Sequence, residues 1–297
     1  MDKTLIVKTG ATGDVVRTTP LLHVIEGEIH WLTQQYNKAI LPTDCRNLTK
    51  IFSIENDKDA VQREFYSKII SLEEEDSICS IITSLRFNSI TGVFIKDGLV
   101  QYTADASRLF DMSLISKLGK RKADEMKFVN TLSYQDMIFE MIGKKFSGQK
   151  YWIKQQRYIK KKIGNKIGIE TRAGQRWKGK IWLGYEQLAG LLTKRGYEIM
   201  FFREKQSLNE YIEDINSCDY IITGDTLAMH IAIALNLPTL AIFTCTSPNE
   251  IYGYSILEKI TSPKLKESFY KTTPVADSIS AIKVDDVFEK CLSMLSI

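Results

Sequence analysis

The stretch that decides the fold runs from Tyr220 to Phe243 and reads YIITGDTLAMHIAIALNLPTLAIF. An apolar run enters a turn at Gly224, an apolar helix follows, and a second apolar run begins after Pro238. Continuous apolar strands joined through a helix are typical of a parallel sheet that is buried on both faces. The sequence therefore predicts a strand, a tight loop, a helix and a second strand of an α/β domain.

The loop after Gly224 is suited to hold an anion. The first N–H groups of a helix lack intrahelical partners, and the helix dipole makes that end positive. Thr226 adds a hydroxyl, and His230 follows about one turn further on. We interpret the loop as a seat for a nucleotide diphosphate. The alternative is structural, with Asp225 or Thr226 as an N-cap and His230 as a core histidine.

Composition narrows the class of protein. The chain has 297 residues, of which 44% are hydrophobic and 26% charged, which is typical of an ordered protein with room for two domains. Its formal net charge of +4 is too small for a dedicated nucleic-acid binder. The five cysteines are widely spaced and form no Cys-x-x-Cys pair, which argues against disulfides and zinc sites.

The first residues and the hydropathy of the chain indicate its location in the cell. A strand begins at Thr4, too early for the apolar core of a signal peptide. No apolar run approaches the roughly 20 residues of a membrane span. We expect a cytoplasmic protein, with peripheral contact at the inner face of the membrane as a further option.

The first half of the chain alternates strands and helices, which favours a parallel sheet covered on both faces. Pro20 is expected to open a helix with Thr19 as its N-cap. Asp97-Gly98 between two alternating runs predicts a hairpin, interpreted as a rim or insertion outside the core. The expected strands are residues 4–8, 30–33 and 67–72, and a further helix is expected over 134–142.

Residues 144–166 are rich in lysine and poor in aliphatic residues, as expected of a linker. The same alternation then restarts, so we predict two similar domains, residues 1–155 and 156–297. Ligands of such sheets bind beyond the carboxyl ends of the strands, which favours a site in an interdomain cleft. In the second domain the expected strands are residues 166–170 and 198–202, and the expected helices are 182–195, 207–215 and 284–295.

A second candidate site follows the first strand, where residues 8–20 read KTGATGDVVRTTP. Gly10 and Gly13 let the backbone turn sharply at the carboxyl edge of the sheet. Asp14 is then placed at the cleft, where a carboxylate can act as a general base on an incoming hydroxyl. The alternative is that Asp14 only caps the following turn.

These two motifs resemble those of the family 9 glycosyltransferases, the heptosyltransferases that use ADP-heptose to build the lipopolysaccharide core. The resemblance lies in Gly13-Asp14-Val15-Val16-Arg17-Thr18-Thr19-Pro20 and in Gly224-Asp225-Thr226 with His230. A third motif, Thr171 to Trp177, opens the second domain, and Gly253-Tyr254 closes the pattern.

The resemblance implies a GT-B fold, with two Rossmann-like domains that hold the acceptor and the nucleotide sugar respectively. It implies inverting transfer without a metal or cofactor, in which Asp14 takes the proton of the acceptor hydroxyl. The expected partners are an ADP-sugar donor, with heptose as the sugar, and a glycan, glycolipid or small-molecule acceptor. The expected donor-binding residues are Thr12, Gly13, Arg172, Gln175, Arg176, Glu204, Asp225, Thr226, Leu227, Ala228 and His230.

Two departures from the family pattern affect the donor site. Gln175 stands where the family commonly has a lysine two residues before the tryptophan. An arginine, Arg172 or Arg176, is expected to take over the leaving-group charge, because its planar fork suits a diphosphate. The segment 203–206 is also short, which leaves Glu204 as the candidate partner of a ribose hydroxyl.

Two other functions stay open at this point. Gly10-Ala11-Thr12-Gly13 and the pair Tyr158 and Lys162 resemble parts of the short-chain dehydrogenases, which would make the protein an NAD(P) oxidoreductase. Val16, however, stands where helix packing usually requires glycine or alanine. The other alternative is a nucleotide-sugar-binding module of the same fold without catalysis.

Two further patterns are weaker candidates for a functional site. Asp57-Lys58-Asp59 matches the Asp-x-Asp motif of metal-dependent glycosyltransferases, but it lacks a flanking strand, so no metal site is expected. Arg86, Tyr102 and Arg108 lie in or near the predicted hairpin, either as surface residues or as the lining of an acceptor pocket.

Overall fold

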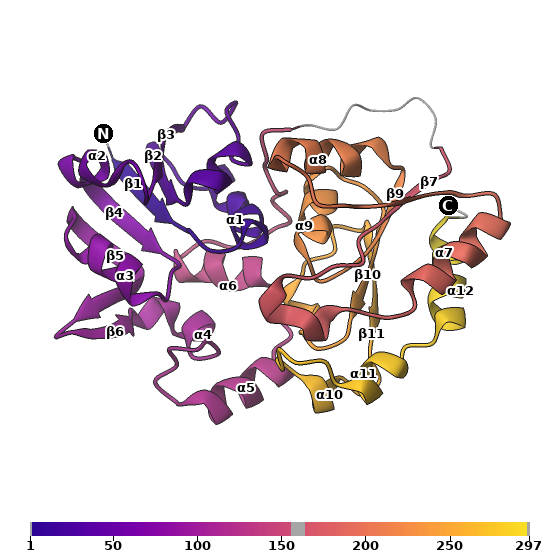
Figure 1. The fold of residues 1–297 in the computed structure, drawn as a ribbon. Coiled ribbons are helices and arrows are strands. Elements are labelled where there is room, and N and C mark those ends of the chain that lie inside the picture. The colour runs from indigo at the N-terminus through magenta and orange to yellow at the C-terminus, as the bar shows by residue number, and fades with distance from the viewer. Residues whose placement is uncertain (1, 156–163, 296–297) are drawn as a thin grey trace. The chain divides into compact units, whose positions relative to one another are not determined.

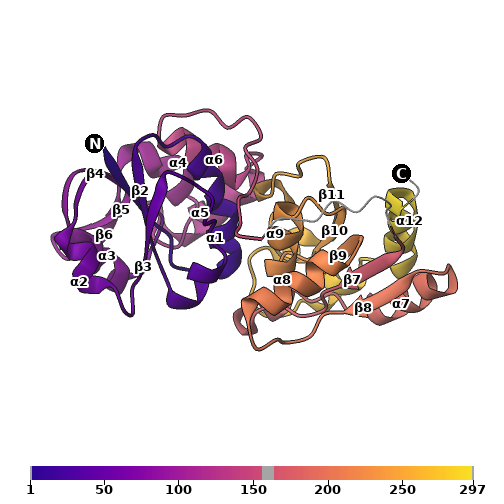
Figure 2. The same cartoon turned by 90° about the horizontal axis from the view of Figure 1, so that it is seen from above.

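The computed structural model describes residues 2–155 and 164–295 (Figures 1 and 2). The chain divides into two compact units, Met1–Lys154 and Gln155–Ile297. Within the described residues, each unit is built on its own sheet, with six strands in unit 1 and five in unit 2. Tyr158 and Lys162, the dehydrogenase-like pair, lie outside the described residues.

The sheet of unit 1 has the order β3-β2-β1-β4-β5-β6. The central strand, β1, pairs in parallel with β2 and with β4. Leu5, Ile6 and Val7 are fully buried, as expected for a strand covered on both faces. The strands are β1 (Lys3–Val7), β2 (Glu28–Thr33), β3 (Leu48–Ser53), β4 (Phe65–Ser71), β5 (Arg86–Lys96) and β6 (Leu99–Tyr102).

The helices of unit 1 include α1, which starts directly after the loop that follows β1. The helix expected to open at Pro20 forms as the 3-10 helix η1, which begins one residue earlier, whereas α1, which begins at Thr12, was not expected. Thr19 does not cap: its hydroxyl donates to the Val16 carbonyl and accepts the Trp152 N–H. The helices are α1 (Thr12–Thr18), η1 (Thr19–His23), η2 (Gln35–Ala39), α2 (Lys58–Arg63), α3 (Asp76–Thr83), η3 (Ala104–Ala106), α4 (Ser107–Phe110), α5 (Lys120–Val129) and α6 (Tyr134–Met141).

The predicted hairpin forms, but its first strand belongs to the main sheet. β5 and β6 are antiparallel, and Asp97 and Gly98 both have positive φ, as a two-residue hairpin turn requires. β5 also runs parallel to β4 over most of the length of β4, so the expected rim or insertion is wrong. Gly92 allows this close pairing, because a Cβ there would lie 1.9 Å from the Ser71 carbonyl oxygen.

The lysine-rich segment expected as a linker packs onto unit 1 over its first part. Phe146 makes an edge contact with Phe139, and Trp152 stacks on His23 at 4.9 Å between ring centroids. The Lys154 N–H donates to the Ile40 carbonyl. Aromatic side chains anchor the segment although most of its residues are polar, which is why composition alone misleads here.

The sheet of unit 2 is parallel, in the order β11-β10-β9-β7-β8. Residues 220–243 form β9, α9 and β10 as predicted. The strands are β7 (Lys166–Ile169), β8 (Glu198–Phe201), β9 (Tyr220–Gly224), β10 (Thr239–Phe243) and β11 (Leu257–Thr261). The helices are η4 (Gln175–Lys180), α7 (Tyr185–Lys194), α8 (Leu208–Ser217), α9 (Leu227–Ala234), η5 (Pro248–Glu250), α10 (Leu265–Ser268), α11 (Ala276–Ser280) and α12 (Val284–Leu295).

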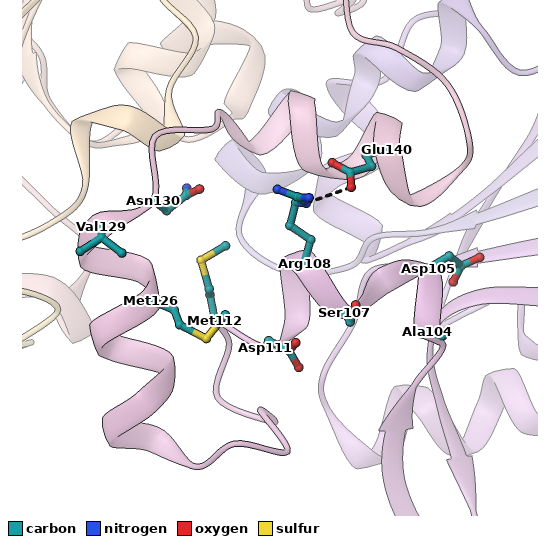
Figure 3. Close-up of a pocket in the computed structure, with 10 residues that line it drawn as sticks. All are labelled: Ala104, Asp105, Ser107, Arg108, Asp111, Met112, Met126, Val129, Asn130 and Glu140. Carbon is teal, nitrogen blue, oxygen red and sulfur yellow. Dashed lines mark hydrogen bonds and ion pairs between the residues drawn. The ribbon is translucent and has the colours of Figure 1, made fainter.

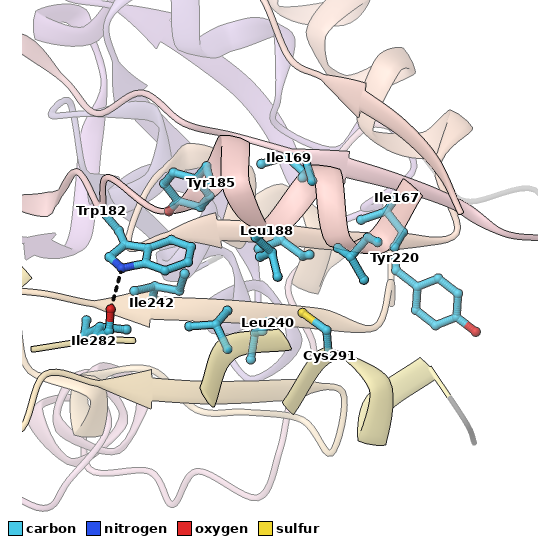
Figure 4. Close-up of a cluster of buried hydrophobic side chains, with 14 of the residues drawn as sticks. Ile167, Ile169, Trp182, Tyr185, Leu188, Tyr220, Leu240, Ile242, Ile282 and Cys291 are labelled. Carbon is cyan, nitrogen blue, oxygen red and sulfur yellow. Dashed lines mark hydrogen bonds between the residues drawn. The ribbon is translucent and has the colours of Figure 1, made fainter. Parts of the chain in front are cut away.

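The core of unit 2 fixes the strand ends that carry the candidate site. Apolar side chains from the sheet, α7 and α12 meet in it, and Cys291 of α12 is fully buried there (Figure 4). Trp182 packs edge-on against Tyr185, and its indole N–H donates to the Ile282 carbonyl at 3.1 Å. Burial of each large side chain contributes about 1.5–3 kcal/mol.

Candidate functional site

The anion seat predicted after β9 has the expected backbone. Thr226 occupies the N-cap position of α9, but its side chain makes no capping hydrogen bond. Its hydroxyl lies 2.9 Å from that of Thr223 instead. Leu227 and Ala228 supply the first N–H groups of the helix, which have no carbonyl partner within it. Donors are therefore gathered at one helix end, where the dipole favours negative charge.

Asp225 forms an ion pair with Lys180, at 2.7 Å between Oδ2 and Nζ. Lys180 also donates to the Asp225 backbone carbonyl at 3.1 Å. Both side chains are largely buried. Burial raises the pKa of Asp225, but Lys180 and His230 lower it more, so that this pKa lies well below its usual range. His230 itself is 5% exposed. Asp225 is thus an ionised carboxylate that holds a cation at the start of α9.

The chain around Lys180 fixes its position. The Gly179 N–H donates to the Thr272 carbonyl, and the Thr244 hydroxyl donates to the Gly179 carbonyl at 2.7 Å. A Cβ on Gly179 would lie 2.7 Å from the Lys271 carbonyl oxygen, so the close approach requires glycine. The Lys180 ammonium also lies 5.1 Å from the centre of the Trp177 ring, a favourable cation–π distance.

Sequence reasoning missed Lys180. The departure at Gln175 directed attention to the neighbouring arginines, yet Gln175 and Arg176 are exposed on η4. The ammonium that reaches Asp225 comes from Lys180, three positions after Trp177. The available signal was a lysine shortly after this motif, but only the fold shows which cation pairs with Asp225.

Arg172 is oriented by a buried carboxylate. Its Nε and Nη2 donate to the two oxygens of Glu170 at 2.9 and 2.8 Å. The Tyr211 hydroxyl donates to Glu170 at 2.6 Å. Hydrogen bonding to Glu170 raises the pKa of Arg172, and the arginine side chain stays 43% exposed. Glu204, the candidate ribose partner, is exposed in the loop before α8.

In unit 1, Asp14 lies in the first turn of α1 and its side chain is 35% exposed. Arg17, one turn further along, pairs with its Oδ1 at 2.9 Å. The Arg17 guanidinium lies over the Tyr134 ring of α6 at 4.1 Å. The Thr18 hydroxyl donates to the Asp14 backbone carbonyl and lies 3.1 Å from the Tyr134 hydroxyl. Asp14 is therefore accessible, and its neighbours on α1 are fixed by α6.

A buried asparagine holds the loop before Asp14. Asn37 of η2 is fully buried and donates to the Thr9 and Gly10 carbonyls at 3.1 and 3.0 Å. It accepts from the Thr12 hydroxyl at 2.7 Å. Gly13 is buried at the start of α1. The side chain of Thr12 is thus engaged in holding the loop together.

A second ion pair stands beside Asp14. Lys8 and Glu73 are 3.1 Å apart, and Glu73 also accepts the N–H groups of Thr9 and Gly10. Burial lowers the pKa of Lys8, but the negative charges of Glu73 and Asp14 raise it by more. The pKa of Lys8 therefore lies above its usual value. Lys8 Nζ, Glu73 Oε1 and Asp14 Oδ2 lie 3.5, 3.6 and 3.9 Å from where a Cβ on Gly10 would stand. Asn37 and Glu73 gave no signal in the sequence.

Unit 1 also contains a cavity of about 580 Å³ beside α4, α5 and α6 (Figure 3). Arg108 and Glu140 form an ion pair at 2.9 Å on its wall. Arg86 and Tyr102, grouped with Arg108 in the sequence, do not line it: Arg86 donates to the Arg63 carbonyl and Tyr102 to Asp111. The lining residues are Ala104, Asp105, Ser107, Arg108, Asp111, Met112, Met126, Val129, Asn130 and Glu140.

The weaker sequence patterns have structural roles or carry no site. Asp57 precedes α2 and accepts the Ser53 N–H at 2.8 Å and the Lys38 ammonium at 3.1 Å. Over residues 2–155 and 164–295, no group of three or more His, Cys, Asp or Glu side chains is placed to hold a metal. In the same residues, no helix combines the length and the apolar character needed to cross a membrane. All five cysteines are buried.

The sequence around Asp225 is similar to that of known proteins. Residues 203–275, which include Asp225 and His230, match the model of glycosyltransferase family 9 (heptosyltransferase). The resemblance to this family is confirmed. Lipooligosaccharide heptosyltransferase 2 of Haemophilus influenzae is 30% identical over 132 residues, which cover 35% of this chain. The match spans only 37% of the length of that relative.

Solved structures show the same fold over nearly the whole chain. E. coli heptosyltransferase WaaC with ADP has a TM-score of 0.64 at 14% identity and covers 98% of this chain and 99% of that chain. The family 9 glycosyl transferase of Veillonella parvula DSM 2008 has a TM-score of 0.67 at 15% identity. The match covers 99% of this chain and 97% of that chain. The expected GT-B fold class, with two Rossmann-like domains, is confirmed.

Proposed function

We propose that this protein is an inverting, metal-independent glycosyltransferase that moves a sugar from an ADP-activated donor to an acceptor hydroxyl, with heptose as the sugar. Unit 2 binds the donor, and unit 1 binds the acceptor and supplies the base. The observation that carries this proposal is the ion pair of Lys180 and Asp225 at the start of α9. It places a cation next to a helix end that favours phosphate.

The donor diphosphate is held by the N–H groups of Leu227 and Ala228, the Thr226 hydroxyl and the Lys180 ammonium. Asp225 would repel a diphosphate directly, so its role is to hold Lys180 in place. His230, which lowers the pKa of Asp225, supplies a further donor. The solved E. coli WaaC structures contain ADP and ADP-2-deoxy-2-fluoro heptose. We infer an ADP-sugar donor here from the shared fold and the family 9 match over residues 203–275.

The transfer step needs a base opposite the leaving group. Asp14 accepts the proton of the acceptor hydroxyl while the hydroxyl oxygen bonds to the anomeric carbon. The bond from that carbon to the diphosphate oxygen breaks, and the donors of unit 2 stabilise the charge that develops on the leaving group. Single displacement on the face opposite the diphosphate inverts the anomeric configuration. Arg17, paired with Asp14, keeps the carboxylate oriented before the acceptor arrives.

The acceptor site includes the cavity beside α6. Tyr134, at the start of α6, contacts Arg17, and Glu140, near its end, lines the cavity. Six residues of helix span about 9 Å, which leaves room for an acceptor to reach from the cavity to Asp14. The carboxylates and the guanidinium on the cavity wall suit sugar hydroxyls, and the methionines suit an apolar portion. A glycan or glycolipid acceptor fits best, handled by a cytoplasmic enzyme at the inner face of the membrane.

A thermal-shift screen against ADP-, UDP- and GDP-sugars tests the donor. We expect stabilisation by ADP-heptose, and a ligand at about 100 times its Kd adds about 2.7 kcal/mol to the unfolding free energy. Stabilisation by UDP-sugars alone would contradict the proposal. Binding of ADP-heptose without transfer to any acceptor would instead support a nucleotide-sugar-binding module.

A further inference from the structure

One segment of unit 1 exposes apolar side chains, of which Val129 also lines the proposed acceptor cavity. Leu114 is 75% exposed, Leu118 51%, Phe128 39% and Val129 72%. They belong to α5 and to the loop that precedes it. Single exposed apolar residues are ordinary, but a group of them marks an interaction surface.

The same segment is basic. Residues 114–129 contain five Lys and Arg residues but only two acidic residues. Lys120 pairs with Asp124, and Lys122 pairs with Glu125 at 3.7 Å. Both pairs are well exposed, so they are weak and exchange readily for other anions. The basic residues are Lys117, Lys120, Arg121, Lys122 and Lys127.

The geometry of α5 places cations beside apolar side chains. Ala123 is 2% exposed and marks the inward face, on which Met126 lines the cavity (Figure 3). Residues seven positions apart lie on the same side of a helix, because seven residues make nearly two turns. Arg121 therefore lies on the same side as Phe128, and Lys122 lies on the same side as Val129. Each pair thus presents a charged head and an apolar group in one direction.

We propose that residues 114–129, which we call the basic apolar segment, form a docking surface for an anionic lipid bilayer. Phosphate headgroups satisfy the cations, and the apolar side chains enter the boundary between headgroups and acyl chains. Lysine stems can lie along that boundary with their ammonium groups in water. A protein partner is less suited, because interfaces between proteins are depleted in lysine. A nucleic acid would leave the exposed Leu and Val side chains unused.

The cavity supports this choice of partner. Met126, Val129 and Asn130 line it, so α5 carries both the cavity wall and the exposed face. A bilayer bound to the basic apolar segment would bring a glycolipid to the mouth of the cavity. Lipid docking does not depend on transferase activity and goes beyond it, so the two proposals can fail separately.

Co-sedimentation of the full chain with vesicles tests the proposal. Phosphatidylcholine vesicles are compared with vesicles that also contain phosphatidylglycerol. We expect binding to the anionic vesicles that weakens with added salt. Arg121→Glu with Lys122→Glu should lower the partition coefficient at least about tenfold, since each cation near the surface contributes strongly. Phe128→Ser with Val129→Ser should also lower it.

Matched double variants control for general charge and hydrophobicity. Lys58→Glu with Arg63→Glu changes two exposed cations of α2, and Leu99→Ser with Leu183→Ser changes two exposed leucines. Both controls should bind like the wild type, and circular dichroism checks that every variant is folded.

Several outcomes would overturn the proposal. These are absence of binding, equal binding to vesicles without phosphatidylglycerol, unchanged binding in the segment variants, or an equal loss in the controls. Size-exclusion chromatography tests one competing occupant. If the wild type self-associates and the segment variants do not, the surface is occupied by a second copy of the chain.

Discussion

The loops after β1 and β9 carry the same local pattern, yet their aspartates have different surroundings. In both, a Gly-Asp pair stands where a buried parallel strand gives way to a helix, but Gly13 and Asp14 lie in the first turn of α1, whereas Gly224 and Asp225 precede α9. The Asp14 side chain is 35% exposed and pairs with Arg17 of the next turn. That of Asp225 is 15% exposed and pairs with Lys180, which is 45 positions away. A Gly-Asp motif at a strand end therefore does not decide the role of the carboxylate.

The partners explain the difference in role. Arg17 is a neighbour on the same helix, and because the Asp14 side chain is 35% exposed, water screens the pair and it contributes less to stability. Asp14 can thus change partner when an acceptor binds. The pair of Asp225 and Lys180 is largely buried, and loss of either partner would leave a buried charge. Asp225 therefore serves as a fixed support for a cation.

The largest expected effect is on catalysis by Asp14→Asn. Removal of a general base lowers the transfer rate by about 10²–10⁴-fold. Donor affinity should not change, because the proposed donor site lies in unit 2. Steady-state kinetics with a saturating ADP-sugar measures the rate. Asp59→Asn, an exposed aspartate of α2, is the control and should keep full activity.

Lys180→Met is expected to act on the donor. A hydrogen bond to a charged group contributes about 1.5–3 kcal/mol, so affinity for ADP should fall by roughly 10–150-fold. Isothermal titration with ADP gives the Kd. Lys178→Met changes an exposed lysine of the same helix, η4. If both variants lose affinity alike, Lys180 has no special role.

Asp225→Asn should destabilise the protein in a pH-dependent way. At neutral pH the loss is about 3–5 kcal/mol of unfolding free energy, the cost of breaking a buried pair. The pKa of Asp225 is lowered from 3.8, so its contribution is full above that value and is lost as pH falls through the lower folded-state pKa. Denaturant unfolding should show a constant difference from wild type near neutrality that shrinks in acid. A difference that already shrinks between about pH 7 and 5 would contradict this.

The smallest expected effect is that of Asn37→Ala. The variant removes the donors to Thr9 and Gly10 and the acceptor of Thr12. We expect a loss of about 1–3 kcal/mol in unfolding free energy and slower transfer, with the Kd for ADP unchanged. Thermal and chemical unfolding measure the first effect. Asn56→Ala, at an exposed asparagine, is the matched control, and a change in Kd would show that the loop after β1 reaches the donor.

Local patterns predicted the parts of the fold that depend on near neighbours. The apolar runs on both sides of Gly224 gave β9, α9 and β10, and the spacing of Val284, Val287 and Cys291 gave α12. The sequence also placed Asp14 shortly after the first strand, although the next helix was expected only at Pro20 and not at Thr12. Such features arise from hydrophobic periodicity and glycine turns, which the sequence shows directly.

Long-range pairing could not be predicted from the sequence. Nothing in the motif marks Lys180 rather than Arg176 as the partner of Asp225, because η4 and β9 meet only after folding. Glu73 follows β4 and Asn37 lies in η2, yet both hold the loop after β1. The pairing of β5 with β4 was missed for the same reason. The role of each candidate site residue stays a prediction.

The most direct test compares Asp14→Asn and Asp225→Asn in two assays, titration with ADP and transfer from the ADP-sugar. The central claim is that one aspartate acts on the acceptor and the other supports the donor. It predicts that Asp14→Asn keeps the wild-type Kd for ADP and loses transfer, whereas Asp225→Asn weakens the binding of ADP. Equal losses of ADP affinity in the two variants, or wild-type transfer by Asp14→Asn, would contradict it.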